Sequence, residues 1–312
     1  MIALEAGTTE YQGSRAILPR DSGFVERDGV RTFYEVYGHG TTTVLLLPTW
    51  SIVHSRIWRA QIAYLARHFR VVVFDGRGNG RSDRPLEAAA YMAHEFAFDA
   101  LAVLDATGTD RVVSVSLSAG TAWNAMVCAH SPERVQAAVF IGPTVYAKSA
   151  PFPEWSTIPY NEELESYDDC RGQNRYFIRD HYRDFADMWT RICANEPHSA
   201  RSVEFGLGMS LETTPEVVLA TLDASDMADY ESSAERLAQS YTELRPLVRE
   251  LRLPSLVMVG ELEQVAMPHW AAALAEDLRG ELQVIPGAGH VPGRKAVPFN
   301  LGLRRFVEGV AP

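Results

Sequence analysis

The sequence predicts an α/β fold: a mostly parallel, doubly wound sheet interrupted by an inserted helical cap. Apolar runs of strand length alternate with segments of helical periodicity from residue 24 to about 146, and the alternation resumes at about residue 254. Between residues 147 and 253 the β-branched runs disappear, and aromatic segments of helical character replace them. We therefore expect a core domain of residues 1–146 and 254–312 and a cap of residues 147–253.

The first half of the core begins with an antiparallel edge. Residues 24–37 alternate around an Asp28–Gly29 pair, which is the signal of a two-residue hairpin. Buried strands and amphipathic helices then take turns along the chain. We expect strands over 43–47, 70–74, 112–117 and 135–141, and helices over 55–68, 90–106 and 120–130.

The second half of the core repeats this pattern after the cap. A strand is expected over 255–259, a helix over 268–279, a strand over 282–285 and a terminal helix over 297–310. Strands that are separated by helices pair in parallel through crossover connections. The two halves are therefore expected to contribute to one sheet.

Composition and charge exclude several classes of function. The chain has 29 Lys and Arg against 40 Asp and Glu, a net charge of -11, and no cluster of basic residues. The electrostatic footprint of a protein that binds nucleic acid or an anionic membrane is therefore missing. No apolar run reaches the length of a membrane span, and residues 1–20 lack a secretion-signal pattern. We expect a cytoplasmic protein with a small-molecule partner, and leave open whether it forms a homo-oligomer.

The cysteines do not have a pattern typical of disulfides or of a metal site. Cys128, Cys170 and Cys193 are odd in number and lack the spacing of metal ligands. We therefore expect neither disulfides nor a metal site, and no cofactor.

The most informative motif is a turn between a strand and a helix. Residues 112–120 read Val-Val-Ser-Val-Ser-Leu-Ser-Ala-Gly, a β-branched strand that runs through a small-x-Ser-x-Gly turn into an Ala-rich helix. Such a turn strains its central residue and pushes that side chain above the edge of the sheet. With Ser116 and Gly120 as small neighbours, Ser118 is predicted to be an exposed nucleophile.

A serine hydroxyl at neutral pH needs a base, and that base needs an orienting carboxylate. His290 ends the small-residue loop 286–290, which follows the last predicted strand of the sheet. The loop after strand 255–259 offers two carboxylates, Glu261 and Glu263. We expect Glu263, which lies farther beyond the strand, to be the partner of His290, with Glu261 as the alternative.

The three residues occur in the chain order Ser118, Glu263, His290, which is the nucleophile-acid-base order of the α/β-hydrolase superfamily. The chain resembles this superfamily over about two thirds of its length. Residues 45–50, Leu-Leu-Leu-Pro-Thr-Trp, stand where the family has a strand followed by His-Gly-x. Residues 75–82, Asp-Gly-Arg-Gly-Asn-Gly-Arg-Ser, are similar to its Asp-x-Arg-Gly-x-Gly-x-Ser loop. The chain departs from the family pattern at Pro48–Thr49, at Ser116 and in having Glu263 in place of aspartate, and none of these changes removes a required chemical group.

The resemblance implies an α/β-hydrolase fold and an oxyanion hole built from the backbone N–H groups of Trp50 and Ala119. The loop containing Arg77 is interpreted as scaffold, because its glycines permit tight turns and Arg77 can bond nearby carbonyls. Residues 47–58 are similar to a bacterial group of these hydrolases. The candidate substrate contacts are His54, Trp58, Phe185, Met188 and Trp189.

Taken together, these features predict a serine hydrolase that cleaves an ester or lactone of an apolar small molecule through an acyl-enzyme on Ser118. A serine at the elbow argues against haloalkane dehalogenases and epoxide hydrolases, which attack with a carboxylate. The same triad also serves C–C bond hydrolysis, acyl transfer or a lyase step on this fold. A further alternative is a ligand sensor without catalytic activity.

Overall fold

The computed structural model describes residues 17–168, 170 and 172–311. Eight strands form one sheet in the order β1-β2-β4-β3-β5-β6-β7-β8. Strands β1 and β2 are an antiparallel edge, β2 joins β4 antiparallel, and every later pair is parallel. The predicted mostly parallel sheet is confirmed. Residues 1–16 of the expected core lie outside the described residues. They include most of residues 1–20, in which no secretion signal was expected.

The strands form close to where the apolar runs predict them. Asp28 and Gly29 have φ values of 52° and 79°, as a two-residue turn with both central residues in the left-handed region requires. The strands are β1 (Asp21–Arg27), β2 (Val30–Tyr37), β3 (Thr43–Leu46), β4 (Arg70–Phe74), β5 (Val112–Leu117), β6 (Val135–Ile141), β7 (Ser255–Gly260) and β8 (Glu281–Ile285).

The core helices agree with the prediction except at two starts and at the end of the first helix, which was expected over 55–68. Residues 55–58 form a 3₁₀ turn, and α1 occupies only Arg59–Leu65. The helix expected over 90–106 begins at Ala93, because Met92 has an extended ψ of 146° that separates it from a 3₁₀ turn over Ala88–Tyr91. The other core helices are α2 (Ala93–Ala106), α3 (Gly120–His130), α9 (Pro268–Leu278) and α10 (Ala296–Val310).

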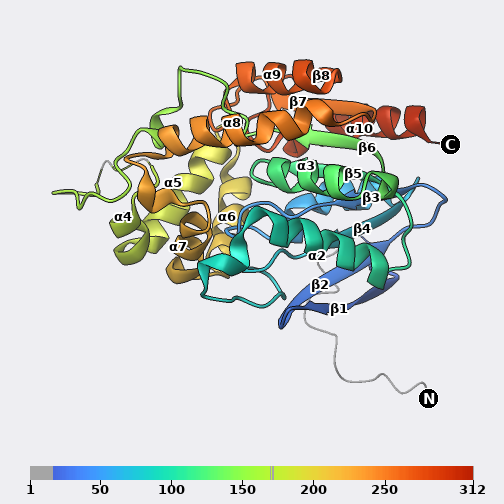
Figure 1. Ribbon diagram of the computed structural model, residues 1–312, viewed down its shortest axis with the longest axis horizontal. Helices are drawn as coiled ribbons and strands as arrows, with labels where there is room; N and C mark the ends of the chain where they lie inside the picture. Colours follow the sequence, from blue (N-terminus) through green and yellow to red (C-terminus); the bar gives the residue numbers. More distant parts are fainter. Residues whose placement is uncertain (1–16, 169, 171, 312) are drawn as a thin grey trace.

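Two apolar layers cover the two faces of the sheet, as the alternation of strand side chains dictates. Leu45 and Leu47 belong to the cluster under α2, α3 and α9, whereas Val44 and Leu46 belong to the cluster under α1 and α10. Figure 1 shows α2 and α3 on one side of the strands. The sheet is therefore buried on both faces, and its carboxyl edge is left to hold functional loops.

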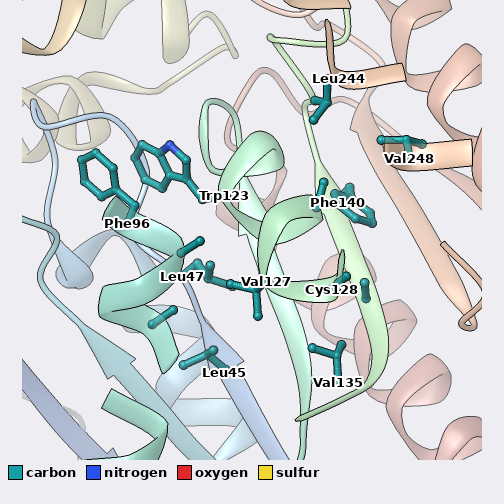
Figure 2. Packing of buried hydrophobic residues seen from close by; sticks show 14 of the residues in the cluster. Leu45, Leu47, Phe96, Trp123, Val127, Cys128, Val135, Phe140, Leu244 and Val248 are labelled. Atoms are coloured by element: carbon teal, nitrogen blue, oxygen red, sulfur yellow. The ribbon is translucent and has the colours of Figure 1, made fainter. Parts of the chain in front are cut away.

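Helices fill the segment between β6 and β7. They are α4 (Arg175–Asp180), α5 (Tyr182–Cys193), α6 (Ala200–Ser210), α7 (Pro215–Asp223) and α8 (Ser233–Glu250). Most of this segment has its own apolar cluster, which includes Phe185 and Trp189. The C-terminal half of α8 instead places Leu244 and Val248 in the same core cluster as Phe140 of β6, and Figure 2 shows these side chains together. The division at residues 147 and 253 stays a prediction.

None of the helices that the described residues form has both the length and the apolar character needed to cross a lipid bilayer.

The loop after β4 is held by a buried ion pair. The Arg77 guanidinium donates to both carboxylate oxygens of Asp99 at 2.7 and 2.8 Å and to the Ala90 carbonyl at 2.8 Å. Both side chains are almost fully buried. A buried, bidentate pair of this kind is costly to break, because the remaining charge has no water around it. Arg77 thus serves as scaffold, as expected.

We predict that Asp99→Ala lowers the free energy of unfolding by about 3–5 kcal/mol, because it leaves the Arg77 guanidinium buried without its carboxylate. Urea unfolding followed by circular dichroism measures the change. Asp83→Ala is the control, because its pair with Arg31 is largely exposed and is worth about 1 kcal/mol or less. Equal losses in the two variants would contradict the assignment.

Candidate active site

Ser118 lies in a tight turn between β5 and α3. Its φ of 56° places a non-glycine residue in the left-handed region, where backbone strain is expected. Gly120 makes the turn sterically possible, because a Cβ at this position would lie 2.8 Å from the Pro48 carbonyl oxygen. The turn therefore holds the Ser118 side chain at the carboxyl edge of the sheet, at the start of α3.

His290 and Glu263 come together from two loops that are 27 residues apart. His290 Nδ1 lies 2.9 Å from Glu263 Oε2, and both residues are buried. A carboxylate only accepts hydrogen bonds, so the Nδ1–H donates, and in the neutral ring the lone pair is on His290 Nε2. Gly142 leaves room for the pair, because a Cβ there would lie 3.1 Å from Nδ1. His290 thus has the tautomer that a general base requires.

The structure distinguishes the two candidate carboxylates. Glu263 Oε1 accepts the backbone N–H groups of Val265 and Ala266 at 2.7 and 3.1 Å, which fixes the carboxylate that faces His290. Glu261 is exposed, and its carboxylate accepts the Gly287 N–H at 2.8 Å instead. The geometry favours Glu263 as the partner of His290.

Ser118 and His290 line the same cavity, but their side chains are not hydrogen-bonded to each other. The hydrogen-bond partner of Ser118 Oγ within the described part of the chain is the Thr144 hydroxyl, at 3.3 Å. Thr144 follows β6 and also lines the cavity. Thr144 thus contacts the Ser118 hydroxyl and shares the cavity with His290.

Two backbone N–H groups are available beside Ser118. In the described part of the chain, neither the Trp50 nor the Ala119 N–H donates to a protein acceptor, and both residues line the cavity. Such donors, fixed before charge develops, lower the barrier to acyl transfer by about 3 kcal/mol each. The Thr49 hydroxyl on the same wall is buried and unpartnered among the described residues. These groups have the chemistry of an oxyanion hole.

The cavity has a volume of about 610 Å³ and extends beneath the cap. Of the five substrate contacts expected from the sequence, Trp189 lines it. Its ring packs edge-on against Trp50 and Trp155, with centroids 5.4 and 4.9 Å away. Trp155, which the sequence analysis did not single out, lines the cavity as well.

The other four expected contacts do not line the cavity and have structural roles. His54 accepts the Arg56 N–H and caps the 3₁₀ turn over residues 55–58, and Trp58 Nε1 donates to the Leu47 carbonyl at 2.9 Å. Phe185 is fully buried in the cap cluster, and Met188 packs against that cluster from its edge. These side chains are used for capping and packing rather than for the cavity wall.

Cys193 is a second group of nucleophilic type on the cavity wall. Burial raises the pKa of its thiol to about 12, and the nearby Arg294 only partly offsets this. A thiol with so high a pKa is almost entirely protonated at neutral pH and is a poor nucleophile. Ser118 is therefore the better candidate.

The segment between β6 and β7 hydrogen-bonds to both loops that carry Glu263 and His290. Glu196, in the loop after α5, accepts the Gly289 N–H at 3.0 Å, next to His290. Its neighbour Asn195 donates to the Leu262 carbonyl at 2.7 Å, next to Glu263. Nothing in the sequence distinguishes Asn195 and Glu196 from other polar residues of the cap, so sequence reasoning missed them.

Among the described residues, no group of three or more His, Cys, Asp or Glu side chains is placed to hold a metal ion.

Comparison with protein families finds a match over residues 42–293 to a family described as alpha/beta hydrolase fold. Some curated relatives match only in part. The chain spans 41% of the length of a RutD protein from Variovorax paradoxus (strain S110), at 32% identity over 35% of the chain. It spans 26% of epoxide hydrolase 1 from Siraitia grosvenorii, at 36% identity over 26% of the chain.

Other relatives match along most of the chain. Pimeloyl-[acyl-carrier protein] methyl ester esterase from Edwardsiella ictaluri (strain 93-146) is 25% identical over 89% of this chain and 97% of its own. The solved structure of Est816, described as an N-acyl homoserine lactone degrading enzyme, is 26% identical with a TM-score of 0.69, over 91% and 100% of the two chains. Bromoperoxidase from Bacillus anthracis has the same fold, with a TM-score of 0.71 at 19% identity over 92% and 100%.

We predict that Glu263→Gln slows labelling of Ser118 by a fluorophosphonate by about 10³–10⁴-fold, because an amide facing Nδ1 favours the wrong tautomer of His290. Glu261→Gln is the matched control and is expected to label at the unmodified rate. Mass spectrometry of the labelled peptide over time measures both rates. The reverse pattern would identify Glu261 as the partner of His290.

We predict that Glu196→Ala slows the same labelling by about 100-fold, because the Gly289 N–H loses its acceptor and the His290 ring shifts. Glu196→Gln keeps an acceptor oxygen and is expected to restore most of the rate. Rate-versus-pH profiles of the two variants separate displacement of His290 from general loss of structure. Labelling of the Ala variant at the unmodified rate would show that the contact does not position His290.

Proposed function

The chain belongs to the α/β-hydrolase family, and we propose that it is a serine hydrolase that cleaves a carboxylic ester or lactone of an apolar small molecule. The observation that carries this proposal is the buried His290–Glu263 pair, which shares a cavity with the strained Ser118. The carboxylate orients the base, and the base faces the space where the nucleophile lies. This is the relation that acyl transfer requires.

The proposed reaction runs through an acyl-enzyme. Ser118 Oγ bonds to the carbonyl carbon of the substrate while His290 Nε2 accepts the hydroxyl proton, and the Trp50 and Ala119 N–H groups hold the oxyanion. The bond from carbon to the alcohol oxygen then breaks, and that oxygen takes the proton from His290. Water attacks the acyl-enzyme by the same route, which releases the acid and restores Ser118.

The relatives support reaction at a carboxylic carbonyl. An esterase from Edwardsiella ictaluri and a bifunctional esterase/perhydrolase from Acinetobacter calcoaceticus match most of the chain at 25% identity. Est816 is described as degrading N-acyl homoserine lactones. The apolar wall of the cavity, to which Trp155 and Trp189 of the cap contribute, suits an uncharged ester or lactone better than a sugar or a phosphate.

We predict that Ser118→Ala lowers kcat/KM for 4-nitrophenyl butanoate by at least about 10⁴-fold, because no other group on the cavity wall replaces the hydroxyl. Cys193→Ala is the control and is expected to keep both ester cleavage and labelling. A peptide map after fluorophosphonate treatment identifies the modified residue.

The outcomes are distinct. Modification at Ser118 together with loss of cleavage in Ser118→Ala supports the proposal. Absence of labelling and of cleavage in the unmodified protein would overturn it and would favour a ligand sensor. Ester cleavage that persists in Ser118→Ala would also overturn it.

A further inference from the structure

The cavity does not end at Ser118 but follows α3. The lining residues are Ala119, which precedes the helix, and Ala122, Trp123, Met126 and His130 of α3, and they recur at intervals of three and four. Residues at this spacing form one stripe along a helix. From Ala119 to His130, at about 1.5 Å per residue, the stripe is about 16 Å long. One wall of the cavity is therefore the whole length of α3.

The opposite wall comes from α8, which packs against α3. Leu237, Leu244 and Leu247 line the cavity along one side of α8. Near Ser118, the side chains of Ala119 and Ala122 are small and leave space beside the helix. Farther along, Trp123 stacks on Phe96 of α2 with ring centroids 3.8 Å apart, and Figure 2 shows the two rings face to face. These side chains form a long apolar channel.

The arginine that lines the channel, Arg236, has partners close by. Arg236 donates to the Ser240 hydroxyl at 2.8 Å and to the Glu243 carboxylate at 3.1 Å, and it also bonds the Ser225 carbonyl. Its charge is therefore already paired within α8. An anionic group in the channel would have to displace these contacts, whereas an alkyl chain does not disturb them.

The proposed reaction indicates which part of the cavity holds the leaving group and which part holds the acyl group. The leaving oxygen must take its proton from His290, so the leaving group lies on the side lined by Val291, Arg294 and Cys193. The acyl carbon is bonded to Ser118, two residues before the first residue of α3. The acyl part of the substrate therefore extends along α3, away from His290.

We infer that the channel between α3 and α8 binds the linear apolar acyl chain of the substrate. The protein then prefers esters or lactones of medium-length and long unbranched acids over those of short acids. This inference rests on the proposed function, because it needs the acyl carbon at Ser118. The apolar contact area gained with each added methylene provides the preference.

The test compares 4-nitrophenyl butanoate, octanoate and dodecanoate as substrates. The unmodified protein is expected to have a higher kcat/KM for octanoate and dodecanoate than for butanoate. Met126→Trp fills the middle of the channel and is expected to lower the ratio of dodecanoate to butanoate kcat/KM by about tenfold or more. Thr242→Trp places the same ring on the exposed side of α8, and it is expected to leave this ratio unchanged.

A binding measurement separates this inference from the proposed function. Calorimetry with dodecanoic and butanoic acids on Ser118→Ala does not depend on turnover. Tighter binding of dodecanoic acid that is lost in Ser118→Ala/Met126→Trp supports the channel. If butanoate is cleaved through Ser118 while neither the unmodified protein nor Met126→Trp shows the chain-length effect, the channel assignment is overturned and the hydrolase proposal stands.

If no ester is cleaved and no serine is labelled, the proposed function fails and this inference fails with it. Long-chain binding to Ser118→Ala would then show an apolar ligand site without hydrolysis.

Discussion

The buried hydrogen bond between His290 and Glu263 is the constraint on which the site depends. At 2.9 Å and between two buried residues, it fixes which nitrogen of the neutral ring carries the proton. The other nitrogen is then available to the cavity that Ser118 shares. The sheet brings these groups together, because β5, β7 and β8 are parallel and the loops that follow them lie at the same edge.

Ser118, the proposed nucleophile, is held differently from His290. Its hydroxyl contacts Thr144, and the strained turn fixes its backbone. The His290 ring is instead fixed by its hydrogen bond to Glu263. In the proposed reaction, preorganisation therefore resides in the backbone donors and in the His290–Glu263 pair, where movement is most costly to catalysis.

The sheet and most core helices were predictable, because strand and helix periodicities agree with the burial that the fold imposes. Ser118 and His290 were predictable from small residues around them, since glycine-rich turns are a local signal. The choice of Glu263 over Glu261 followed from its distance beyond the strand. The two short helix starts were not predictable, because Met92 and the turn before α1 depend on tertiary contacts.

The cap was predictable only as a helical segment. Phe185 and Trp189 are four residues apart on α5, so spacing places them on one side of the helix. Their surroundings differ, because other aromatic rings of the cap cover Phe185 while Trp189 reaches the cavity. Thr144, Asn195 and Glu196 have roles that arise from contacts across distant parts of the chain, for which a single sequence has no signal.

The contacts of Asn195 and Glu196 attach one edge of the helical segment between β6 and β7 to the loops before Glu263 and His290. If this edge were to move away from the sheet, both hydrogen bonds would break and the two loops would lose that support. Under the proposed function, a substrate that entered by such a movement would meet His290 and Glu263 before they were fully positioned. Bond formation at Ser118 would then wait until the segment had returned to its place.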